Sequence, residues 1–288
     1  MTCSSLALAM LLLAVDEAGE GAAAASASLE EQLQVINGEE ARHWQMWTDR
    51  SKQSAAALIE KPVYLWTNPT KNGVQYGSVF IWAHEGRPIV VGSIFAHPIM
   101  GRRRLVHEFH ALTTTPLVAQ CSDEQESVWE PAAGIALAPL PGADAPESTA
   151  GKRLIQMRKL GREFGGHTVD WRKQRWELRL LTQPIYRYEL PTKDATGEVV
   201  DGALLALVTD AGTDPEVLLL LEARKKGWHY ALVRFSDSSL YVTHREKEVW
   251  SAERGPEEQQ NHNADHTYQV FQKPLIDEPV VAAEKSTP

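Results

Sequence analysis

The spacing of apolar residues changes from a helical period to a strand period at Pro62. Between residues 29 and 60 apolar side chains recur at roughly helical spacing, with Asn37-Gly38 as an expected break. Beyond Pro62, apolar and polar residues alternate in four segments separated by turn residues, which is typical of antiparallel strands. We expect these strands at Val63–Trp66, Tyr76–Trp82, Pro88–Ala96 and Arg104–Thr113.

A similar order recurs in the second half of the chain. Arg153–Phe164 places apolar residues on one helical stripe, and six strand-like segments follow. These are Trp176–Leu181, Ile185–Leu190, Gly202–Thr209, Glu216–Ala223, His229–Phe235 and Leu240–His244. Residues 62–66 resemble 184–188, and 77–82 resemble 202–207. Two interpretations remain open: two similar units, each a helix followed by a meander, or one α+β sheet whose amphipathic strands look alike.

Composition divides the chain into five segments. Residues 131–150 hold four prolines and few charges, which indicates a linker or a long surface loop. Residues 251–288 are acidic and rich in Gln and Asn, so we expect a partly or wholly disordered tail. The predicted order is a signal peptide (1–27), a first α+β unit (28–130), the Pro/Ala-rich linker, a second α+β unit (151–250) and the tail. The predicted fold class is α+β, with helices packed on antiparallel sheets.

The N-terminal residues favour export. Leu6 to Val15 is a ten-residue apolar run, which suits a signal peptide and falls short of the ~20 residues of a membrane helix. Ala25-Ser26-Ala27 fits a cleavage signal, but no Lys or Arg precedes the run, so a mis-assigned start or a disordered leader is the alternative. We predict a periplasmic or extracellular protein with no transmembrane segment in the mature chain. Cys121 would then have no cysteine to pair with.

The charge balance disfavours nucleic acid as a partner. The net charge is −9, so the whole molecule repels polyanions, although residues 152–179 carry nine Lys and Arg against three Asp and Glu. We interpret this basic segment as a solvated helix face followed by a basic turn.

The segment "LVHEFHALT" (105–113) contains the most conspicuous candidate chemistry. A zinc protease uses His-Glu-x-x-His on a helix, whereas here two residues separate the histidines. On a strand, His107 points to one face while Glu108 and His110 point to the other. Glu108 and His110 are therefore the candidate catalytic residues, and a metal would need further ligands such as His84 or His97. The alternative is a half-buried strand whose polar residues pair with neighbours.

Other motifs are weaker. An Arg and aromatic set in the second half is a candidate ligand surface, although we favour the interpretation as core aromatics and exposed arginines. Its members are Arg179, Tyr186, Arg187, Tyr188, Trp228, Tyr230 and Arg234, of which Arg179, Arg187, Tyr188 and Arg234 are the candidate ligand-binding residues. His262 and His266 belong to a segment with little helix propensity, and Asp214-Pro215-Glu216 is best explained as a turn. The sequence has no nucleophile elbow, phosphate loop or dinucleotide fingerprint, and we predict no cofactor.

Several longer runs resemble a family of uncharacterised exported bacterial proteins. They include Trp66-Thr-Asn-Pro69, Gly86-Arg-Pro88, Glu108-Phe-His-Ala-Leu112, Gln156-Met-Arg158, "ELRLLTQPIYRYE" (177–189) and "DGALLALVTDAGTDPEVLLLLEAR" (201–224). The resemblance covers roughly residues 40–250. It implies an exported bacterial protein and brings no activity or functional residues with it.

Three functional hypotheses follow. We favour an exported, non-catalytic protein that binds a partner protein or a small ligand. The first alternative is an exported hydrolase that uses a metal or a His/Glu acid–base pair. The second is a structural role in the cell envelope.

Overall fold

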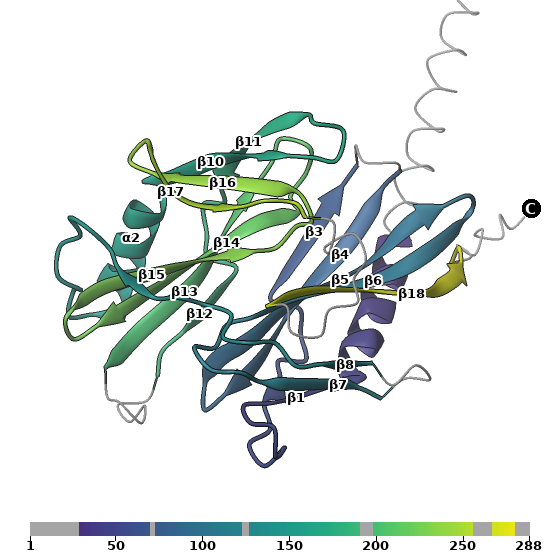
Figure 1. Ribbon diagram of the computed structural model, residues 1–288, viewed down its shortest axis with the longest axis horizontal. Coiled ribbons are helices and arrows are strands. Elements are labelled where there is room, and N and C mark those ends of the chain that lie inside the picture. The colour runs from purple at the N-terminus through teal and green to yellow at the C-terminus, as the bar shows by residue number, and fades with distance from the viewer. Residues whose placement is uncertain (1–28, 70–72, 123–126, 191–197, 256–266, 280–288) are drawn as a thin grey trace, which may run out of the picture.

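The computed structural model describes residues 29–69, 73–122, 127–190, 198–255 and 267–279. Strands account for 52% of these residues and helices for 12%. The predicted α+β class is therefore wrong, because the protein is built mostly from curled antiparallel sheets that pack against one another (Figure 1). None of the described helices is long and apolar enough to cross a membrane. The predicted signal peptide (1–27) lies outside the described residues.

The predicted helix over residues 29–60 is much shorter in the structure. Residues 29–42 are helical and continue through Asn37-Gly38, because the Asn37 side chain is buried and donates a hydrogen bond to Ser78 Oγ at 3.2 Å. The chain then forms two short strands, β1 (Trp44–Trp47) and β2 (Ala57–Leu58). Trp44 and Met46 alternate with exposed residues and are buried, so tertiary packing overrides the helical spacing.

The first sheet has the strand order β18-β6-β5-β4-β2, and β3 also pairs with β4. Its main strands are β3 (Tyr64–Asn68), β4 (Gln75–His84), β5 (Arg87–Ile99), β6 (Arg102–Ala111) and β18 (Tyr268–Asp277). On its outer side lies a small sheet of β1, β7 (Val118–Cys121) and β8 (Val128–Trp129). All four strands predicted in the first half are thus present, with bounds that are shifted or extended by a few residues.

The second sheet has the order β17-β16-β10-β11-β13-β14-β15-β9, and β12 also pairs with β13. The strands are β9 (Ala138–Pro139), β10 (Phe164–Val169), β11 (Arg175–Leu180), β12 (Tyr186–Tyr188), β13 (Val199–Val208), β14 (Pro215–Arg224), β15 (Gly227–Arg234), β16 (Ser239–His244) and β17 (Lys247–Ala252). Helix α2 (Ala150–Gly161) begins at Thr149, whose hydroxyl accepts a hydrogen bond from Lys152 N. It ends before Phe164, which starts β10 instead of continuing the helical stripe.

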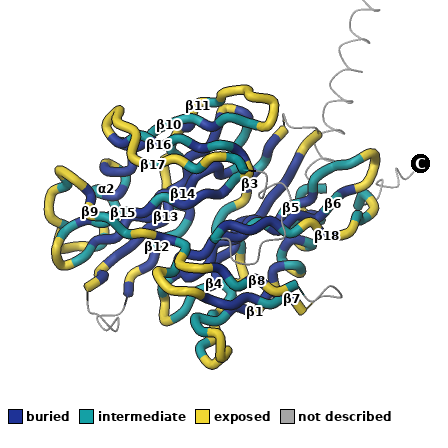
Figure 2. Tube along the Cα trace, in the orientation of Figure 1, coloured by how far each residue is buried: buried dark blue, intermediate teal, exposed yellow. Residues whose placement is uncertain are grey.

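The two sheets share one hydrophobic core, which we call the inter-sheet core. It joins Trp66, Val79 and Ile81 of the first sheet to Leu204, Leu218 and Leu220 of the second. Leu219 and Leu221 point to the opposite face, into a core that α2 covers with Met157 and Leu160. The continuous run Leu218–Leu221 is therefore buried on both faces, as its composition predicts (Figure 2).

An aromatic ring lies over a glycine in each half. A Cβ added to Gly77 would lie 2.0 Å from the Trp66 ring, and one added to Gly202 would lie 2.2 Å from the Tyr188 ring. In both places the aromatic residue sits directly opposite the glycine on the paired strand. These are the segments that resemble each other in sequence, so the close approach of ring and backbone explains the recurring glycine.

The Pro/Ala-rich segment 131–150 is packed onto both sheets. The backbone N–H groups of Gly134 and Ile135 donate to Thr113 O, and Leu140 N donates to Trp228 O. Ile135 joins the inter-sheet core and Leu140 joins the core beneath α2.

Part of the tail predicted to be disordered is a strand of the first sheet. β18 pairs with β6 from Tyr268 opposite His110 to Asp277 opposite Arg102. Tyr268 and Val270 are buried. The alternation of apolar and polar residues within this segment is a better predictor of its structure than the polar composition of the whole tail. His262 and His266 lie outside the described residues.

Candidate functional site

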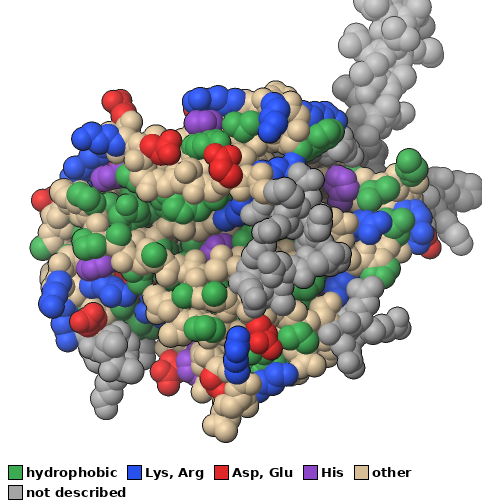
Figure 3. Space-filling view, in the orientation of Figure 1, with side chains coloured by type: hydrophobic (Ala, Val, Ile, Leu, Met, Phe, Trp, Pro, Cys, Tyr) green, Lys and Arg blue, Asp and Glu red, His purple; other side chains and the backbone are tan. Residues whose placement is uncertain are grey.

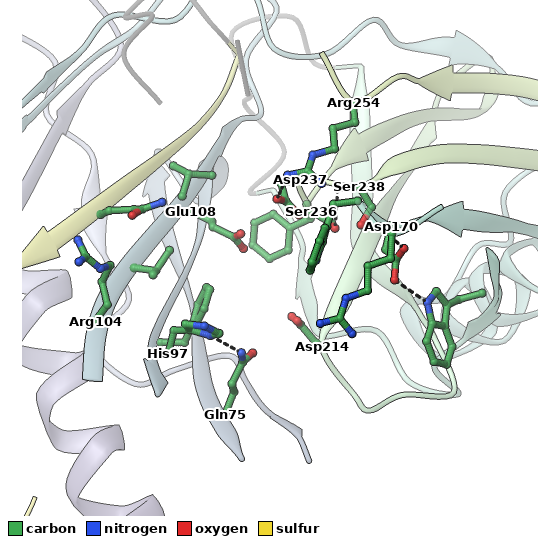
Figure 4. A pocket seen from close by; sticks show the side chains of 18 of the residues that line it. Gln75, His97, Arg104, Glu108, Asp170, Asp214, Ser236, Asp237, Ser238 and Arg254 are labelled. Carbon is green, nitrogen blue, oxygen red and sulfur yellow. Dashed lines mark hydrogen bonds and ion pairs between the residues drawn. The ribbon is translucent and has the colours of Figure 1, made fainter. Parts of the chain in front are cut away.

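A pocket of about 610 Å³ lies between one end of the first sheet and the loops of the second. We call it the inter-sheet pocket (Figure 4). The first sheet contributes Gln75, Phe95, His97, Ile99, Arg104, Val106, Glu108, Val270 and Gln272. The second contributes Asp170, Trp171, Arg172, Gln174, Trp176, Asp214, Phe235, Ser236, Asp237, Ser238 and Arg254.

The floor of the pocket follows directly from strand register. His97 of β5 is opposite Arg104 of β6, and Phe95 is opposite Val106. Val270 of β18 is opposite Glu108. Residues opposite one another share a face of an antiparallel sheet, so the floor runs from the His97–Arg104 pair, through the apolar Phe95–Val106 pair, to Glu108 beside Val270.

Glu108 forms the acidic end of the floor and points toward the second sheet (Figure 4). Its Oε1 accepts a hydrogen bond from the Tyr268 hydroxyl at 3.2 Å. Burial raises the pKa of the Glu108 carboxyl well above its usual range, and the Asp214 and Asp237 carboxylates raise it further. Asp237 in turn forms an ion pair with Arg254 at 3.3 Å.

His97 and Arg104 form the basic end of the floor. His97 Nδ1 lies 2.6 Å from Gln75 Nε2. Burial lowers the pKa of His97, and the nearby Arg103 and Arg104 lower it further, so the imidazole is neutral at neutral pH. The Arg104 side chain lines the pocket and makes no hydrogen bond or ion pair with another described residue.

The β10–β11 turn forms part of the opposite wall. Asp170 Oδ1 accepts hydrogen bonds from the backbone N–H groups of Arg172 and Gln174, both at 2.9 Å. Asp170 Oδ2 lies 3.4 Å from Trp176 Nε1. The turn is thereby fixed, and it presents Trp171, which is 62% exposed, beside the Arg172 guanidinium 4.6 Å from its ring centroid. Other Lys and Arg side chains also lie over the β10–β11 edge (Figure 3).

Arg234 supports the pocket wall from within the protein. This candidate ligand residue is buried, and its guanidinium donates to Ser236 O at 2.8 Å, Ser238 O at 2.9 Å and Glu253 O at 3.0 Å. Arg234 does not line the pocket. Its contacts are those of a residue that holds the loop carrying Ser236, Asp237 and Ser238.

The other candidate ligand residues also belong to the framework. Arg187 forms an ion pair with the fully buried Asp201 at 2.6 Å, and the Tyr188 hydroxyl donates to Glu222 Oε1 at 2.7 Å. Arg179 is exposed and donates to Gly212 O at 3.3 Å. None of the three lines the inter-sheet pocket.

The candidate metal ligands are not brought together. His110 is buried and does not line the pocket, its Nδ1 lies 2.8 Å from Ala111 O, and burial lowers its pKa to about 4. His84 lies at the far end of β4, with Nδ1 3.2 Å from Ala55 O. Of the four candidates, Glu108 and His97 line the pocket. Within the described ranges, no three His, Cys, Asp or Glu residues are arranged to hold a metal ion.

His107 points away from the pocket, as strand alternation requires. It is fully buried, its Nδ1 accepts a hydrogen bond from Trp44 Nε1 at 3.0 Å, and its Nε2 lies 3.2 Å from Glu40 Oε2. Cys121 is also buried, 3.7 Å from Lys273 Nζ, and contributes to the hydrophobic core beneath the small sheet.

Sequence reasoning missed the wall contributed by the second sheet. Asp170, Trp171, Asp237 and Arg254 lie in turns or at a strand end, and Asp214 was assigned only to a turn. One sequence signal could have indicated this wall. Trp171 lies in the polar run "DWRKQ" (170–174), which offers a tryptophan no buried face.

Comparison of the chain with protein-family models, with curated proteins and with solved structures found no match. The resemblance to exported bacterial proteins therefore stays a prediction, and function has to be argued from the site.

Proposed function

We propose that this protein is a non-catalytic binding protein whose ligand occupies the inter-sheet pocket. The observation that carries the proposal is the pocket itself, about 610 Å³ in volume, with charged and aromatic side chains from both sheets on its walls. Small-molecule sites are typically concave, within this range of volume, and fitted with a few directed polar groups.

The site supports binding better than hydrolysis. Glu108 faces the pocket, whereas His110, its proposed acid–base partner, lies outside the pocket lining with one ring nitrogen directed at a backbone carbonyl. The contact made by the Glu108 carboxyl is with the Tyr268 hydroxyl, whose pKa is raised well above its usual range by burial and by that carboxylate. The site therefore offers hydrogen bonding and charge, and the His/Glu pair of the hydrolase hypothesis is not formed.

A ligand screen by thermal shift tests the proposal. The purified protein is compared with Glu108→Gln in the pocket and with Glu177→Gln, an exposed residue of β11 that pairs with Arg175 outside it. We expect a ligand that raises the Tm of the wild type and of Glu177→Gln, and raises that of Glu108→Gln less. Equal stabilisation of all three proteins would contradict the proposal, and conversion of the ligand to a product would favour the hydrolase.

Export is part of the same proposal and is supported by the apolar run at residues 6–15. Mass spectrometry of the protein expressed in a bacterium tests it: we expect a mature chain that starts near Ser28 in the extracytoplasmic fraction. A chain that retains its first residues in the cytoplasm would contradict export without affecting the binding proposal.

A further inference from the structure

We propose that the ligand is a short peptide with unmodified ends, held in the inter-sheet pocket with its ammonium group at Glu108 and its carboxylate at Arg104. This inference rests on the proposed function and specifies the class of ligand. It starts from the order of side chains along β6, where Arg104, Val106 and Glu108 all line the pocket.

The separation of the two charged ends suits a tripeptide or tetrapeptide. Arg104 and Glu108 are four residues apart on a strand, which places their Cα atoms about 13 Å apart. An extended peptide of three or four residues spans roughly 10–14 Å. Figure 4 shows Arg104 and Glu108 at opposite ends of the pocket floor, with the second sheet facing Glu108.

The middle of the floor is apolar. Val106 lies between the charged ends and is opposite Phe95 on β5. Phe235 reaches the pocket from the second sheet and is also part of the inter-sheet core, so one wall is a fixed aromatic surface. These side chains suit the non-polar side chains of a peptide, and burial of each favours binding in proportion to its area.

The two ends differ in charge. At one end Glu108 lies close enough to Asp214 and Asp237 for their carboxylates to raise its pKa, and an incoming ammonium group would relieve this repulsion. At the other end Arg104 lies beside a neutral His97, and a guanidinium is suited to bind a terminal carboxylate through two hydrogen bonds. A diamine would leave Arg104 without a partner, and a dicarboxylate would add negative charge beside Glu108.

The test uses the full-length protein and a pooled library of tetrapeptides, with bound peptides identified by affinity-selection mass spectrometry. Three matched pools are compared: unmodified peptides, N-acetylated peptides and C-amidated peptides. The pocket variants are Glu108→Gln and Arg104→Met. The matched controls are Glu177→Gln and Arg175→Met, which alter an exposed pair on β11 outside the pocket.

We expect the wild type and both control variants to retain unmodified peptides, with either modification weakening binding by about tenfold or more. Glu108→Gln should bind acetylated and unmodified peptides equally, and Arg104→Met should no longer discriminate against amidation. The affinity of the wild type should also rise with pH as Glu108 ionises, a dependence that Glu108→Gln lacks.

Three results would overturn the inference. Retention of N-acetylated and C-amidated peptides as strongly as unmodified ones would show that the ends are not recognised. If no peptide is retained while another compound stabilises the protein through Glu108, the peptide inference fails and the proposed function stands. If neither peptides nor any compound of the thermal-shift screen binds, both fail.

Discussion

Arg87 Nη2 of the first sheet lies 2.5 Å from Glu222 Oε1 of the second, and the Glu222 side chain is fully buried. The same carboxylate accepts hydrogen bonds from the Tyr188 hydroxyl at 2.7 Å and from Arg224 Nη2 at 2.8 Å. One buried acid therefore ties the two sheets together. Glu222 lies among the leucines of β14, and a carboxylate buried in such surroundings needs a hydrogen-bond partner for each oxygen.

Removing this charge should destabilise the fold strongly. We expect Glu222→Gln to lower the free energy of unfolding by about 3–5 kcal/mol, since it leaves two guanidinium groups facing a neutral amide. Arg87→Met should cost less, about 1–3 kcal/mol, because Arg224 and Tyr188 remain. Urea denaturation of Glu222→Gln, of Arg87→Met and of the double variant measures these losses of stability. Additive effects in the double variant would contradict direct coupling of the pair.

An exposed ion pair provides the control. Arg102 and Asp277 lie 3.1 Å apart on the rim, with side chains 48% and 92% exposed. Solvent screens such a pair, so Arg102→Met should lower stability by less than about 1 kcal/mol.

Glu108 should make the free energy of unfolding depend on pH, and the Glu108→Gln variant should lack this dependence. Its folded pKa lies well above the ordinary 4.5, so ionisation costs the folded state more than the unfolded chain. The contribution of Glu108 is therefore most favourable below the ordinary pKa and declines as pH rises toward the folded pKa. Urea titrations from about pH 4 to pH 8 should show Glu108→Gln gaining on the wild type as pH rises. A constant difference between the two proteins would argue against the raised pKa.

His110 should affect the pH dependence of stability in the opposite direction. Burial lowers its pKa from 6.5 to about 4, with the nearby Arg234 acting in the same direction. Its stabilising contribution is complete above the unfolded pKa and is lost as pH falls toward 4, a difference of about 3 kcal/mol. In His110→Gln the decline of stability between about pH 6.5 and pH 4 should be shallower. An imidazole NMR titration of the wild type with an ordinary midpoint would refute this.

Arg234→Met tests whether that residue positions the pocket wall. The substitution removes three hydrogen bonds to backbone carbonyls, at 2.8, 2.9 and 3.0 Å, and should lower stability by about 2–3 kcal/mol. Hydrogen exchange should accelerate at residues 236–238 and 253–255 while the β4–β5 hairpin stays protected. Unchanged exchange in the loop would contradict the structural role.

The strand at the end of the chain is predicted to be essential for folding. Truncation after residue 255 removes β18 and exposes the backbone edge of β6 together with Val106, which packs against Tyr268 and Val270. We expect this truncated protein to aggregate, because an unpaired apolar edge promotes association. Truncation after Glu278 keeps β18 and should yield soluble protein, as judged by size-exclusion chromatography. Comparable solubility of the two would contradict the assigned role of β18.

Strand alternation predicted much of the core of this fold. The long strands β4, β5, β6, β13, β14 and β15 were located from alternating or continuously apolar runs bounded by turn residues, and the continuous run of β14 is buried on both faces. The helical spacing over residues 43–60 was misleading, since Trp44 and Met46 fit a strand equally well and the small sheet decides their conformation. β18 was missed because a short alternating segment lies within a polar tail.

The site was predictable only on one side. Alternation placed Glu108 and His107 on opposite faces of β6, which the contacts of both residues confirm. No local pattern indicates that Asp214 and Asp237 lie near Glu108, because they lie in loops more than a hundred residues away in the chain. The loop that carries Asp237 is held by Arg234, which donates hydrogen bonds to Ser236 O and Ser238 O.

The measurement that tests the central claim most directly is NMR chemical-shift mapping of the isotope-labelled protein with the tightest ligand from the screens. If the ligand occupies the inter-sheet pocket, the amide signals of Val106, Glu108, Asp214 and Asp237 should shift together at one saturating concentration. Signals of the small sheet, such as those of Trp44 and Val118 on the outer side of the first sheet, should not move. Saturable shifts confined to residues outside the pocket would contradict the claim that the ligand binds between the two sheets.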